Sequence, residues 1–352
     1  MELWRWQHGG VNRAPTLDRR AVGFDDLPGW GDDDHAAALR AFQTSLGVYG
    51  GLDDGVRQIA AETPPERARA FFETYFQPIA VNDGSPGLLT GYFEPRIAAT
   101  RQPDATHAAP IYALPGDLEL ATPKDAVATR DPPLTAGRRR GDALEPYFTR
   151  AEIEDGALAG RGLEIGYAAD AVDLFIMHVQ GGGVLDFADG PRRATFAGKN
   201  GWPYTSIARV LIERGELTRE AADMAGLLEW LRRDAERASA LMRENQSYIF
   251  FRLLEDASGP VGSAGVALMR GRSLAADPRT HAPGALVWLD APALSYDGAP
   301  LRRLTVVHDT GSAIVGPARG DLFCGSGAEA GAVAGRMKHG CAFFALQPKA
   351  VG

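Results

Sequence analysis

The sequence predicts a mainly β fold with some helices, and three observations favour it. From about Ser247 onward, short runs of strand-forming residues alternate with turns, which is typical of a small β-barrel or a sandwich. The 42 glycines and 23 prolines indicate many turns and argue against a mostly helical chain. The length of 352 residues favours two domains.

The charge balance bears on possible partners. The chain has 37 Lys and Arg against 45 Asp and Glu, which gives a net charge of -8. Nucleic-acid-binding domains usually present a basic face, and the basic cluster at residues 138–140 is explained by a solvated loop. We therefore expect no nucleic-acid partner.

Targeting and redox signals are weak. No apolar run reaches the roughly 18 residues of a membrane helix, and residues 1–8 lack the apolar core of a signal peptide. We expect either a cytoplasmic protein or one whose export signal has been removed. Cys324 and Cys341 are too few for a disulfide framework or a cysteine-based zinc site. Their spacing permits one bridge, and the sequence leaves open whether it forms.

The N-terminal region is predicted to form two helices. Residues 36–43 follow three aspartates, which favour the positive end of a helix. Residues 66–76 follow Pro65, and proline is common at the start of a helix. The aromatic side chains of this second helix are expected to lie in the core.

Strands are predicted next. Residues 88–95 and 109–115 are expected to be short strands, and Pro95 ends the first of them. Residues 122–145, rich in Pro and Arg, are predicted to be loop. The segment Thr149-Arg-Ala-Glu152 has the capping-box spacing, so a short helix should begin there.

The apolar segment 171–187 is predicted to be a buried strand, a glycine-rich bend at 181–183 and a returning strand. A polar loop over 197–206 should lead into a helix over 206–214, and leucine spacing over 218–244 predicts two more helices. Short strands are predicted over 248–252, 265–269, 285–289, 304–308 and 341–346.

Several kinds of active site lack their signature. The seven histidines are scattered without ligand spacing, so we expect no metal and no cofactor. His178, inside an apolar run, is expected to be a hydrogen-bonded core residue. The Gly-x-Ser-x-Gly turn of a serine nucleophile is absent.

Two aspartates near the C-terminal end are the candidates for chemistry. Asp309 and Asp321 each lie beside apolar, strand-forming residues and close to a glycine. Acids held on rigid strands are suited to acid–base catalysis, although aspartate is equally common in ordinary turns. The segment Asp309-Thr-Gly-Ser312 matches one loop of an aspartic protease, but such an enzyme needs two copies and the chain has one.

Aromatic and amide side chains near acids are typical of sugar-binding sites, so the residues are compatible with a glycoside-cleaving enzyme. Ordinary core and turn roles remain equally open for each of them. The side chains concerned are Tyr92, Phe93, Gln180, Lys199, Asn200, Trp202 and Tyr204.

Five motifs, taken in their order along the chain, resemble the membrane-bound lytic transglycosylase A family of bacteria. They are Leu-Thr-Gly-Tyr-Phe-Glu-Pro at 89–95, Phe-Ile-Met-His-Val-Gln-Gly-Gly-Gly at 175–183, Ala-Gly-Lys-Asn-Gly at 197–201, Asn-Gln-Ser-Tyr-Ile-Phe-Phe at 245–251 and Gly-Arg-Ser-Leu-Ala-Ala-Asp-Pro at 271–278. The C-terminal part resembles the family's 3D region, named for three aspartates, which here would be Asp277, Asp309 and Asp321. The resemblance covers roughly residues 85 to 348.

The resemblance implies a double-psi β-barrel with a second, smaller β-domain inserted into it and a glycan-binding groove between the two. The barrel domain, with the N-terminal helices, would take residues 1–95 and 256–352. The insert would take residues 96–255. Ser312 stands where the family commonly has a second glycine, a small change in this loop.

The resemblance also implies the activity of a peptidoglycan lytic exotransglycosylase. The enzyme would cleave the β-1,4 bond between N-acetylmuramic acid and N-acetylglucosamine and leave a 1,6-anhydromuramoyl end. Asp321 would act as acid and then as base, Asp309 would assist it, and Asp277 would be a structural acid. One acid suffices because the attacking C6 hydroxyl belongs to the same sugar. Asp321 must start protonated, so we expect burial or Asp309 to raise its pKa.

Further expectations concern the substrate and its location. The candidate glycan contacts are Thr90, Gly91, Tyr92, Gln180, Gly181, Lys199, Asn200 and Tyr204. Two alternatives remain open: a hydrolase that uses Asp309 and Asp321 as two carboxylates, and a non-catalytic peptidoglycan-binding protein. We expect a monomer that binds peptidoglycan strands and is open to cell-wall enzyme complexes. We expect it in the periplasm or at the outer membrane, although this chain shows neither the export signal nor the lipid-bearing cysteine that family members often carry.

Overall fold

The computed structural model describes residues 18–82, 87–254, 259–311 and 313–350, so Ser312 lies outside the described residues. Strands account for 34% of the chain and helices for 27%, which confirms the prediction of a mainly β protein with some helices. The chain forms two compact units. The barrel unit contains 18–93, Val261–Gly325 and 336–350, and the insert unit contains Glu94–Pro260 and Ser326–Gly335.

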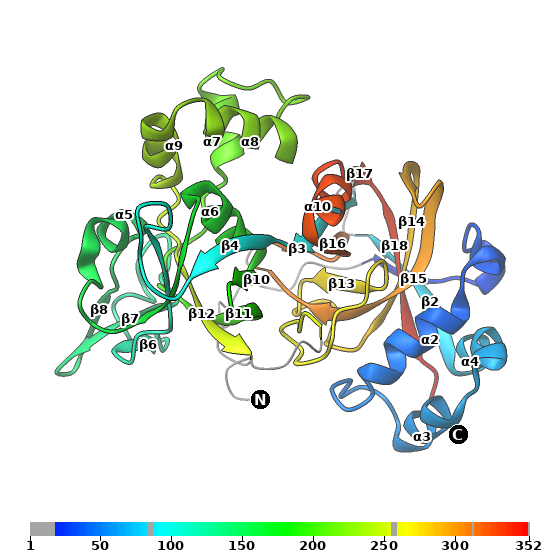
Figure 1. The fold of residues 1–352 in the computed structure, drawn as a ribbon. Coiled ribbons are helices and arrows are strands. Elements are labelled where there is room, and N and C mark those ends of the chain that lie inside the picture. Colours follow the sequence, from blue (N-terminus) through cyan, green and yellow to red (C-terminus); the bar gives the residue numbers. More distant parts are fainter. Residues whose placement is uncertain (1–17, 83–86, 255–258, 312, 351–352) are drawn as a thin grey trace. The chain divides into compact units, whose positions relative to one another are not determined.

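The barrel unit is built on a nine-stranded sheet that curls into a nearly closed barrel (Figure 1). Most neighbouring strands pair antiparallel, whereas β13 pairs with β15 in parallel. The order across the sheet is β1 (Asp18–Ala21), β2 (Phe76–Asn82), β18 (Ala342–Pro348), β14 (Leu286–Tyr296), β15 (Ala299–Asp309), β13 (Ser273–Ala276), β16 (Arg319–Ser326), β3 (Leu88–Glu94) and β17 (Lys338–Gly340).

Helices cover one face of this sheet. α2 (His35–Thr44) and α4 (Ala68–Tyr75) were expected from the sequence, whereas α3 (Asp54–Glu62) was not. Phe42 of α2 and Phe72 of α4 are fully buried in one core with Trp288 of β14. Burying each such side chain stabilises the fold by about 1.5–3 kcal/mol. The packing of α2 and α4 against the sheet therefore stabilises the barrel unit.

The insert unit contains a six-stranded and a three-stranded sheet. The order in the larger sheet is β12 (Ile249–Leu254), β11 (Gly190–Lys199), β10 (Gly182–Phe187), β4 (Arg96–Thr100), β9 (Glu164–Ala168) and β5 (Ala109–Tyr112). The smaller sheet consists of β6 (Leu118–Leu120), β7 (Ala136–Arg140) and β8 (Ala143–Pro146), so part of the predicted 122–145 loop is strand.

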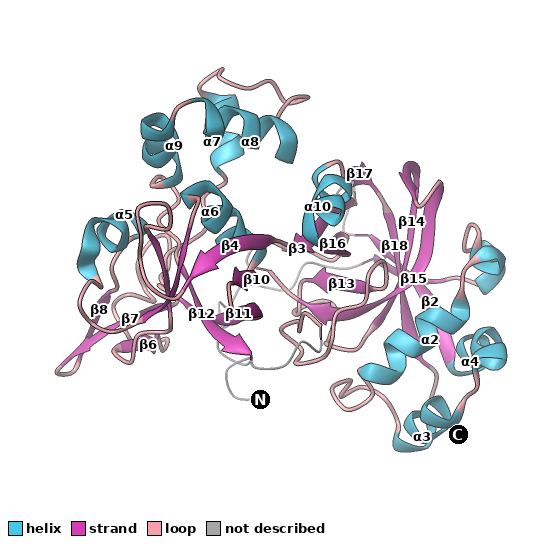
Figure 2. Ribbon diagram, in the orientation of Figure 1, coloured by secondary structure: helices cyan, strands magenta, loops and turns pink. Residues whose placement is uncertain are grey.

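Several helices of the insert unit lie where the sequence predicts them (Figure 2). Thr149 forms the expected capping box with Glu152, and Ser206 caps the predicted helix after the polar loop. The helices are α5 (Arg150–Glu152), which continues as a π-helical turn over Ile153–Ala157, α6 (Ala171–Gln180), α7 (Ile207–Glu213), α8 (Met224–Arg233), α9 (Ala235–Met242) and α10 (Gly327–Gly335).

Three local features correct or settle the sequence analysis. The segment Ala171–Gln180, predicted to be a strand, is helix α6. The segment 265–269, also predicted to be a strand, is irregular apart from an isolated bridge between Ala267 and Val261, and the strand of this region is β13. Cys324 and Cys341 are both buried and free, so the bridge that the spacing permits does not form.

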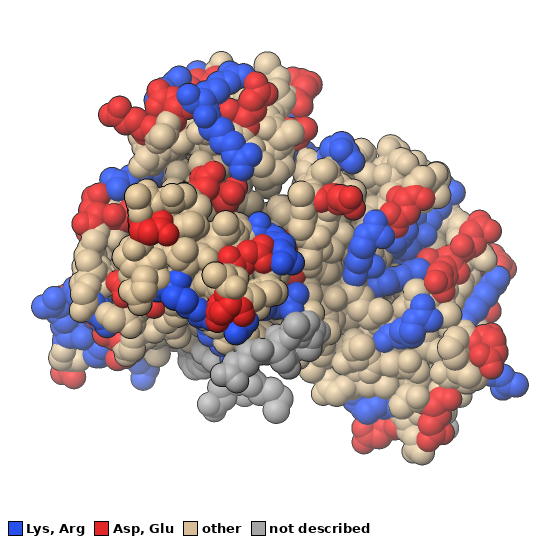
Figure 3. All heavy atoms as spheres, viewed as in Figure 1, with Lys and Arg blue, Asp and Glu red and all other residues tan. Residues whose placement is uncertain are grey.

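The surface mixes acidic and basic side chains. On the face in Figure 3 the two signs are interleaved over both units. Exposed ion pairs such as Arg270–Asp297, at 2.6 Å, join opposite charges, and each contributes little to stability. Within the described ranges, no helix is long and apolar enough to cross a bilayer.

Candidate active site

The two candidate acids lie level with each other on the strands that flank β13. Ala275 of β13 is the register partner of Asp309 on β15 and of Asp321 on β16. Neighbouring strands are about 4.8 Å apart, so the two backbone positions are separated by about 10 Å across β13. Residues level with each other project from the same face of a sheet, so both carboxylates lie on one face.

β3 supplies a contact to each acid. Thr90 Oγ1 donates a hydrogen bond to Asp321 Oδ1 at 2.7 Å, and the hydroxyl of Tyr92 donates to Asp309 Oδ2 at 3.0 Å. Thr90 and Tyr92 are two residues apart, so they share one face of the strand. Gly91 lies between them in β3. The Leu-Thr-Gly-Tyr-Phe-Glu-Pro motif thus meets both acids of the C-terminal region.

Asp321 is suited to carry a proton near neutral pH. Protein atoms surround its carboxyl group while part of the side chain stays accessible. Burial, with a contribution from the nearby charge of Asp309, raises the pKa of Asp321 to about 6. The hydrogen bond from Thr90 and the charge of Arg319 act in the opposite direction. Asp321 therefore remains partly protonated at pH values at which an ordinary aspartate is fully ionised.

Asp309 is held by three donors. Besides the hydroxyl of Tyr92, the backbone N–H groups of Ser263 and Thr310 each donate to Asp309 Oδ1 at 2.9 Å. Burial raises the pKa of Asp309, and these hydrogen bonds oppose the rise. Burial and both acids raise the pKa of Tyr92, so its hydroxyl remains a donor. Its ring packs against Phe323, with centroids 5.3 Å apart.

Asp277 fastens a loop to the end of β13. Its side chain is 2% exposed and accepts hydrogen bonds from the guanidinium of Arg279 and from the backbone N–H of Gly316, at 2.6 and 2.8 Å to Oδ2. Burial alone would raise the pKa of Asp277, but the hydrogen bonds from Arg279 and Gly316 lower it. Asp277 is therefore a charged group that holds the loop before β16.

The other candidate contacts lie in the insert unit. Gln180 is the last residue of α6, and Gly181 caps that helix with the left-handed φ of 80° that favours glycine. Lys199 ends β11 half-buried, burial lowers its pKa, and no described acid forms an ion pair with it. Tyr204 follows in the polar loop, and burial raises its pKa.

Asn200, also predicted to contact the glycan, is fully buried. Its amide group donates to the carbonyl oxygens of Phe148 and Gln246 at 2.9 and 2.8 Å and accepts from the N–H of Tyr248 at 2.9 Å. Both amide hydrogens are used within the insert unit. The structure thus favours a structural role for Asn200 over direct contact with a sugar.

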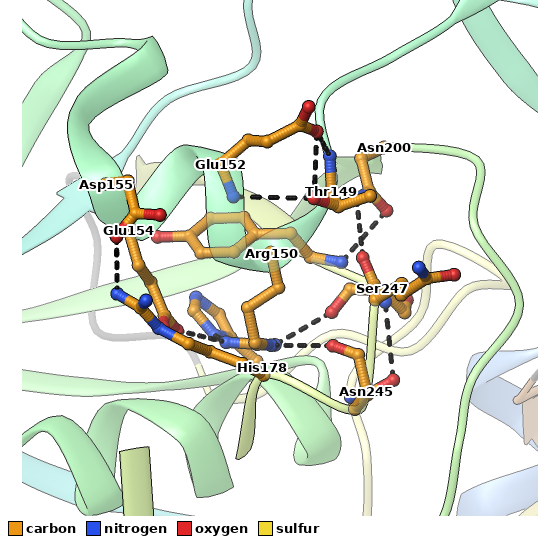
Figure 4. Close-up of polar contacts among 12 residues, drawn as sticks. Thr149, Arg150, Glu152, Glu154, Asp155, His178, Asn200, Asn245 and Ser247 are labelled. Carbon is orange, nitrogen blue, oxygen red and sulfur yellow. Dashed lines mark hydrogen bonds and ion pairs between the residues drawn. The ribbon is translucent and has the colours of Figure 1, made fainter. Parts of the chain in front are cut away.

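Asn200 borders a buried polar cluster around Arg150 (Figure 4). Arg150, 2% exposed, donates to the carbonyl oxygens of Asn245 and Ser247 at 3.1 and 2.8 Å and lies 3.1 Å from His178 Nδ1. A guanidinium group only donates, so Nδ1 accepts and the imidazole is neutral. Burial lowers the pKa of His178, which also favours the neutral imidazole. His178 is the hydrogen-bonded core residue that the sequence predicted.

Two residues near the acids were missed by the sequence analysis. Arg319 lies two positions before Asp321 on β16, a spacing that places two side chains on one face of a strand. That spacing was available in the sequence. Ser263 contacts Asp309 through its backbone N–H and also through its side chain, and it lies outside the motifs found in the sequence. Among the described residues, no group of three or more His, Cys, Asp or Glu side chains is arranged to hold a metal ion.

Two known protein-family domains match this chain, one after the other along the sequence. Residues 88–252 match the MltA specific insert domain and residues 272–347 match the 3D domain. The membrane-bound lytic murein transglycosylase A of Vibrio cholerae is 38% identical over 260 residues, which cover 72% of this chain and 63% of that protein. The Escherichia coli K12 protein of the same name is 34% identical over 259 residues, or 71% and 63% of the two chains. The matched region thus spans less than two thirds of these relatives.

Solved structures agree with this assignment. The membrane-bound lytic murein transglycosylase of Agrobacterium tumefaciens is 37% identical, with a TM-score of 0.86 over 94% of this chain and 97% of that one. MltA of Neisseria gonorrhoeae is 32% identical, with a TM-score of 0.78 over 97% of each chain. E. coli MltA with bound chitohexaose is 27% identical, with a TM-score of 0.71 over 98% and 97%. The chain therefore belongs to the membrane-bound lytic murein transglycosylase A family.

Proposed function

We propose that this protein is a peptidoglycan lytic exotransglycosylase that cleaves the β-1,4 bond between N-acetylmuramic acid and N-acetylglucosamine. The names of its relatives support lytic action on murein. The observation that carries the proposal is Asp321, a largely buried but partly accessible acid on a rigid strand whose pKa is raised to about 6. An acid with that pKa can both donate and accept a proton near neutral pH.

One carboxyl group can perform both proton transfers. Protonated Asp321 donates its proton to the glycosidic oxygen while the bond from C1 to that oxygen breaks. The C6 hydroxyl of the same muramoyl residue then attacks C1, and the carboxylate of Asp321 takes up the hydroxyl proton. No water is consumed, and the product ends in 1,6-anhydromuramic acid. Well-oriented intramolecular attack can lower the barrier by about 7–11 kcal/mol.

A two-carboxylate hydrolase is the second candidate because Asp309 lies on the same face and also has a raised pKa. A hydrolase would need one carboxylate to activate water. Asp309 instead accepts three hydrogen bonds from fixed donors. These donors fix the orientation of the Asp309 carboxyl group beside Asp321, so we propose Asp309 as the assisting acid.

The proposal extends to substrate contacts and location. Thr90, Gly91 and Tyr92 lie on the strand that holds both acids, and a relative was solved with bound chitohexaose. We assign them to the glycan site, together with Gln180, Gly181, Lys199 and Tyr204 of the insert unit. Peptidoglycan lies outside the cytoplasm, so we place the protein in the periplasm or at the outer membrane, where its relatives are named membrane-bound.

Mass spectrometry of digested peptidoglycan tests this function. The unsubstituted protein should release anhydromuropeptides, and the Asp321→Asn protein should release them roughly a thousandfold more slowly. Asp54→Asn is the matched control because Asp54 is fully exposed on α3. Reducing-end products heavier by one water would establish the hydrolase instead, and retained binding without any product would indicate a glycan-binding protein.

A further inference from the structure

We infer that Arg319 forms a carboxylate-binding subsite beside Asp321 that recognises the acidic groups of the peptidoglycan substrate. The inference rests on the proposed function and adds the feature of the substrate that the site selects. Arg319 and Asp321 are two residues apart on β16, so both side chains project from the face that carries Asp309. The two are close enough for the charge of each to affect the ionisation of the other.

Arg319 is a half-buried cation without an acidic partner. Its Nη1 donates to the carbonyl oxygen of Gly320, and it forms no ion pair with any acid among the described residues. Its other N–H groups are not among the buried atoms that lack a partner, so they reach solvent. Part of the guanidinium fork is therefore available to a ligand on the same face as Asp321.

Two other buried arginines of the chain are instead paired with carboxylates. Arg272 makes two hydrogen bonds of 2.8 Å to the carboxylate of Asp33, and Arg193 makes two to the carboxylate of Glu94. A desolvated charge without such a partner is costly, and burial lowers the pKa of Arg319 accordingly. A carboxylate from a ligand would complete the fork with two parallel, charge-assisted hydrogen bonds.

At the start of the proposed reaction, Arg319 has no charged carboxylate directly beside it. The groups facing Arg319 are Asp321, and beyond it Asp309 with its donors Thr90 and Tyr92. The proposed reaction begins with Asp321 protonated and neutral. In that state Arg319 loses its nearest negative charge, so the form of the enzyme that is ready to react is also the form that attracts an anion most strongly.

Peptidoglycan carries the matching chemistry and chitin does not. Each muramic acid bears a lactyl group, whose carboxylate is free on strands without peptides. On intact strands that carboxylate is joined to a peptide stem, which carries carboxylates of its own. Chitin oligomers consist of neutral N-acetylglucosamine units. A carboxylate subsite next to Asp321 would therefore distinguish muramoyl glycans from chitin at the bond to be cleaved.

Calorimetric binding in the Asp321→Asn background tests the inference, because asparagine mimics the neutral acid and prevents turnover. The ligands are a peptide-free muramoyl oligomer, the same oligomer with its lactyl carboxylates converted to methylamides, a stem-bearing oligomer, and chitohexaose. Adding Arg319→Gln should weaken binding of the peptide-free oligomer about tenfold or more and leave the methylamide and chitohexaose within about twofold. Loss confined to the stem-bearing oligomer would identify a stem carboxylate as the partner and also support the subsite.

Two further variants serve as controls for the charge and for the position of the arginine. Arg319→Lys keeps the charge without the fork and should restore part of the affinity. Arg40→Gln removes an exposed arginine of α2 and should change nothing. Equal weakening of all four ligands by Arg319→Gln, or no weakening of any, would overturn the carboxylate subsite alone. Failure of every glycan to bind the protein with Arg319 intact would overturn the proposed function and this inference with it.

Discussion

Two influences favour the neutral form of Asp321, burial and the charge of Asp309, and two favour its charged form. Burial raises its pKa to about 6, whereas the hydroxyl of Thr90 and the charge of Arg319 favour the carboxylate. A reaction that uses the same group as acid and as base needs such a balance. Asp321 and the side chains beside it should therefore set the reaction rate and its pH dependence.

The pH profile gives the first prediction. Because the reaction starts from protonated Asp321, kcat/KM should be high below pH 6 and should fall as pH rises through about 6. Thr90→Val removes a hydrogen bond to the charged form, so the falling limb should move to higher pH by on the order of one unit. Thr90→Ser keeps a hydroxyl and should leave the limb in place. A limb that stays fixed or moves to lower pH in Thr90→Val would count against this role.

Asp309 and Asp321 should differ in what they control. Asp321→Asn should lower kcat by roughly a thousandfold, in the range expected for loss of a general acid. Asp309→Asn should lower kcat by roughly tenfold to a hundredfold through misplacement of the site, with KM little changed and the anhydro product retained. The check is turnover of peptidoglycan combined with product mass. Conversion to reducing-end products, or equal losses in the two variants, would contradict the assignment.

At this scale the sequence indicated both acids because each lies in a short motif of glycines and strand-forming residues. It did not indicate their donors. Thr90 and Asp321 are 231 residues apart in the chain, and Ser263 and Asp309 are 46 residues apart. Such partners depend on the register of strands that no local pattern encodes.

At the scale of elements, α6 shows why one prediction was wrong. Six of its ten residues are buried, so its apolar side chains form no stripe at helical spacing. The run also contains Val, Phe and Ile, which favour strands. Its ends carried the correct signal: Asp170 caps the N-terminus through Val172, and Gly181 ends the helix with a positive φ.

Neighbouring residues at the end of β11 give the third prediction. Asn200→Ala removes three buried hydrogen bonds, so urea unfolding should show a loss of about 2–4 kcal/mol in stability. Lys199→Gln should leave stability nearly unchanged because Lys199 has no ion pair with a described acid. It should instead weaken glycan binding by roughly threefold to tenfold. The reverse pattern would show that the two roles are exchanged.

At the scale of the whole chain, the fold depends on contacts between segments far apart in sequence. The barrel sheet joins β1 and β2 to β18, and β3 to β16 and β17. Compositional patterns predicted strands and a strand-rich C-terminal half, and the family resemblance supplied the barrel with its insert. Neither could supply the pairing of Ala275 with both acids, because that pairing arises only when β13 enters between β15 and β16.

Glu94 offers the clearest test of this long-range organisation. It is 5% exposed at the end of β3, and its carboxylate binds Arg193 of β11 at 2.5 Å and the hydroxyl of Ser326 at 2.6 Å. Glu94→Gln leaves Arg193 with a largely buried, unpaired charge, so stability should fall by about 3 kcal/mol. Ser326→Ala removes one hydrogen bond and should cost about 1 kcal/mol.

Asp189→Asn disrupts exposed ion pairs and should change stability by less than about 0.5 kcal/mol. Urea unfolding of the three variants measures these differences on one scale. If Glu94→Gln were as stable as Asp189→Asn, the buried pair would contribute no more than a surface one. Glu94 would then matter for the active site beside β3 and not for the stability of the contacts between β3, β11 and β16.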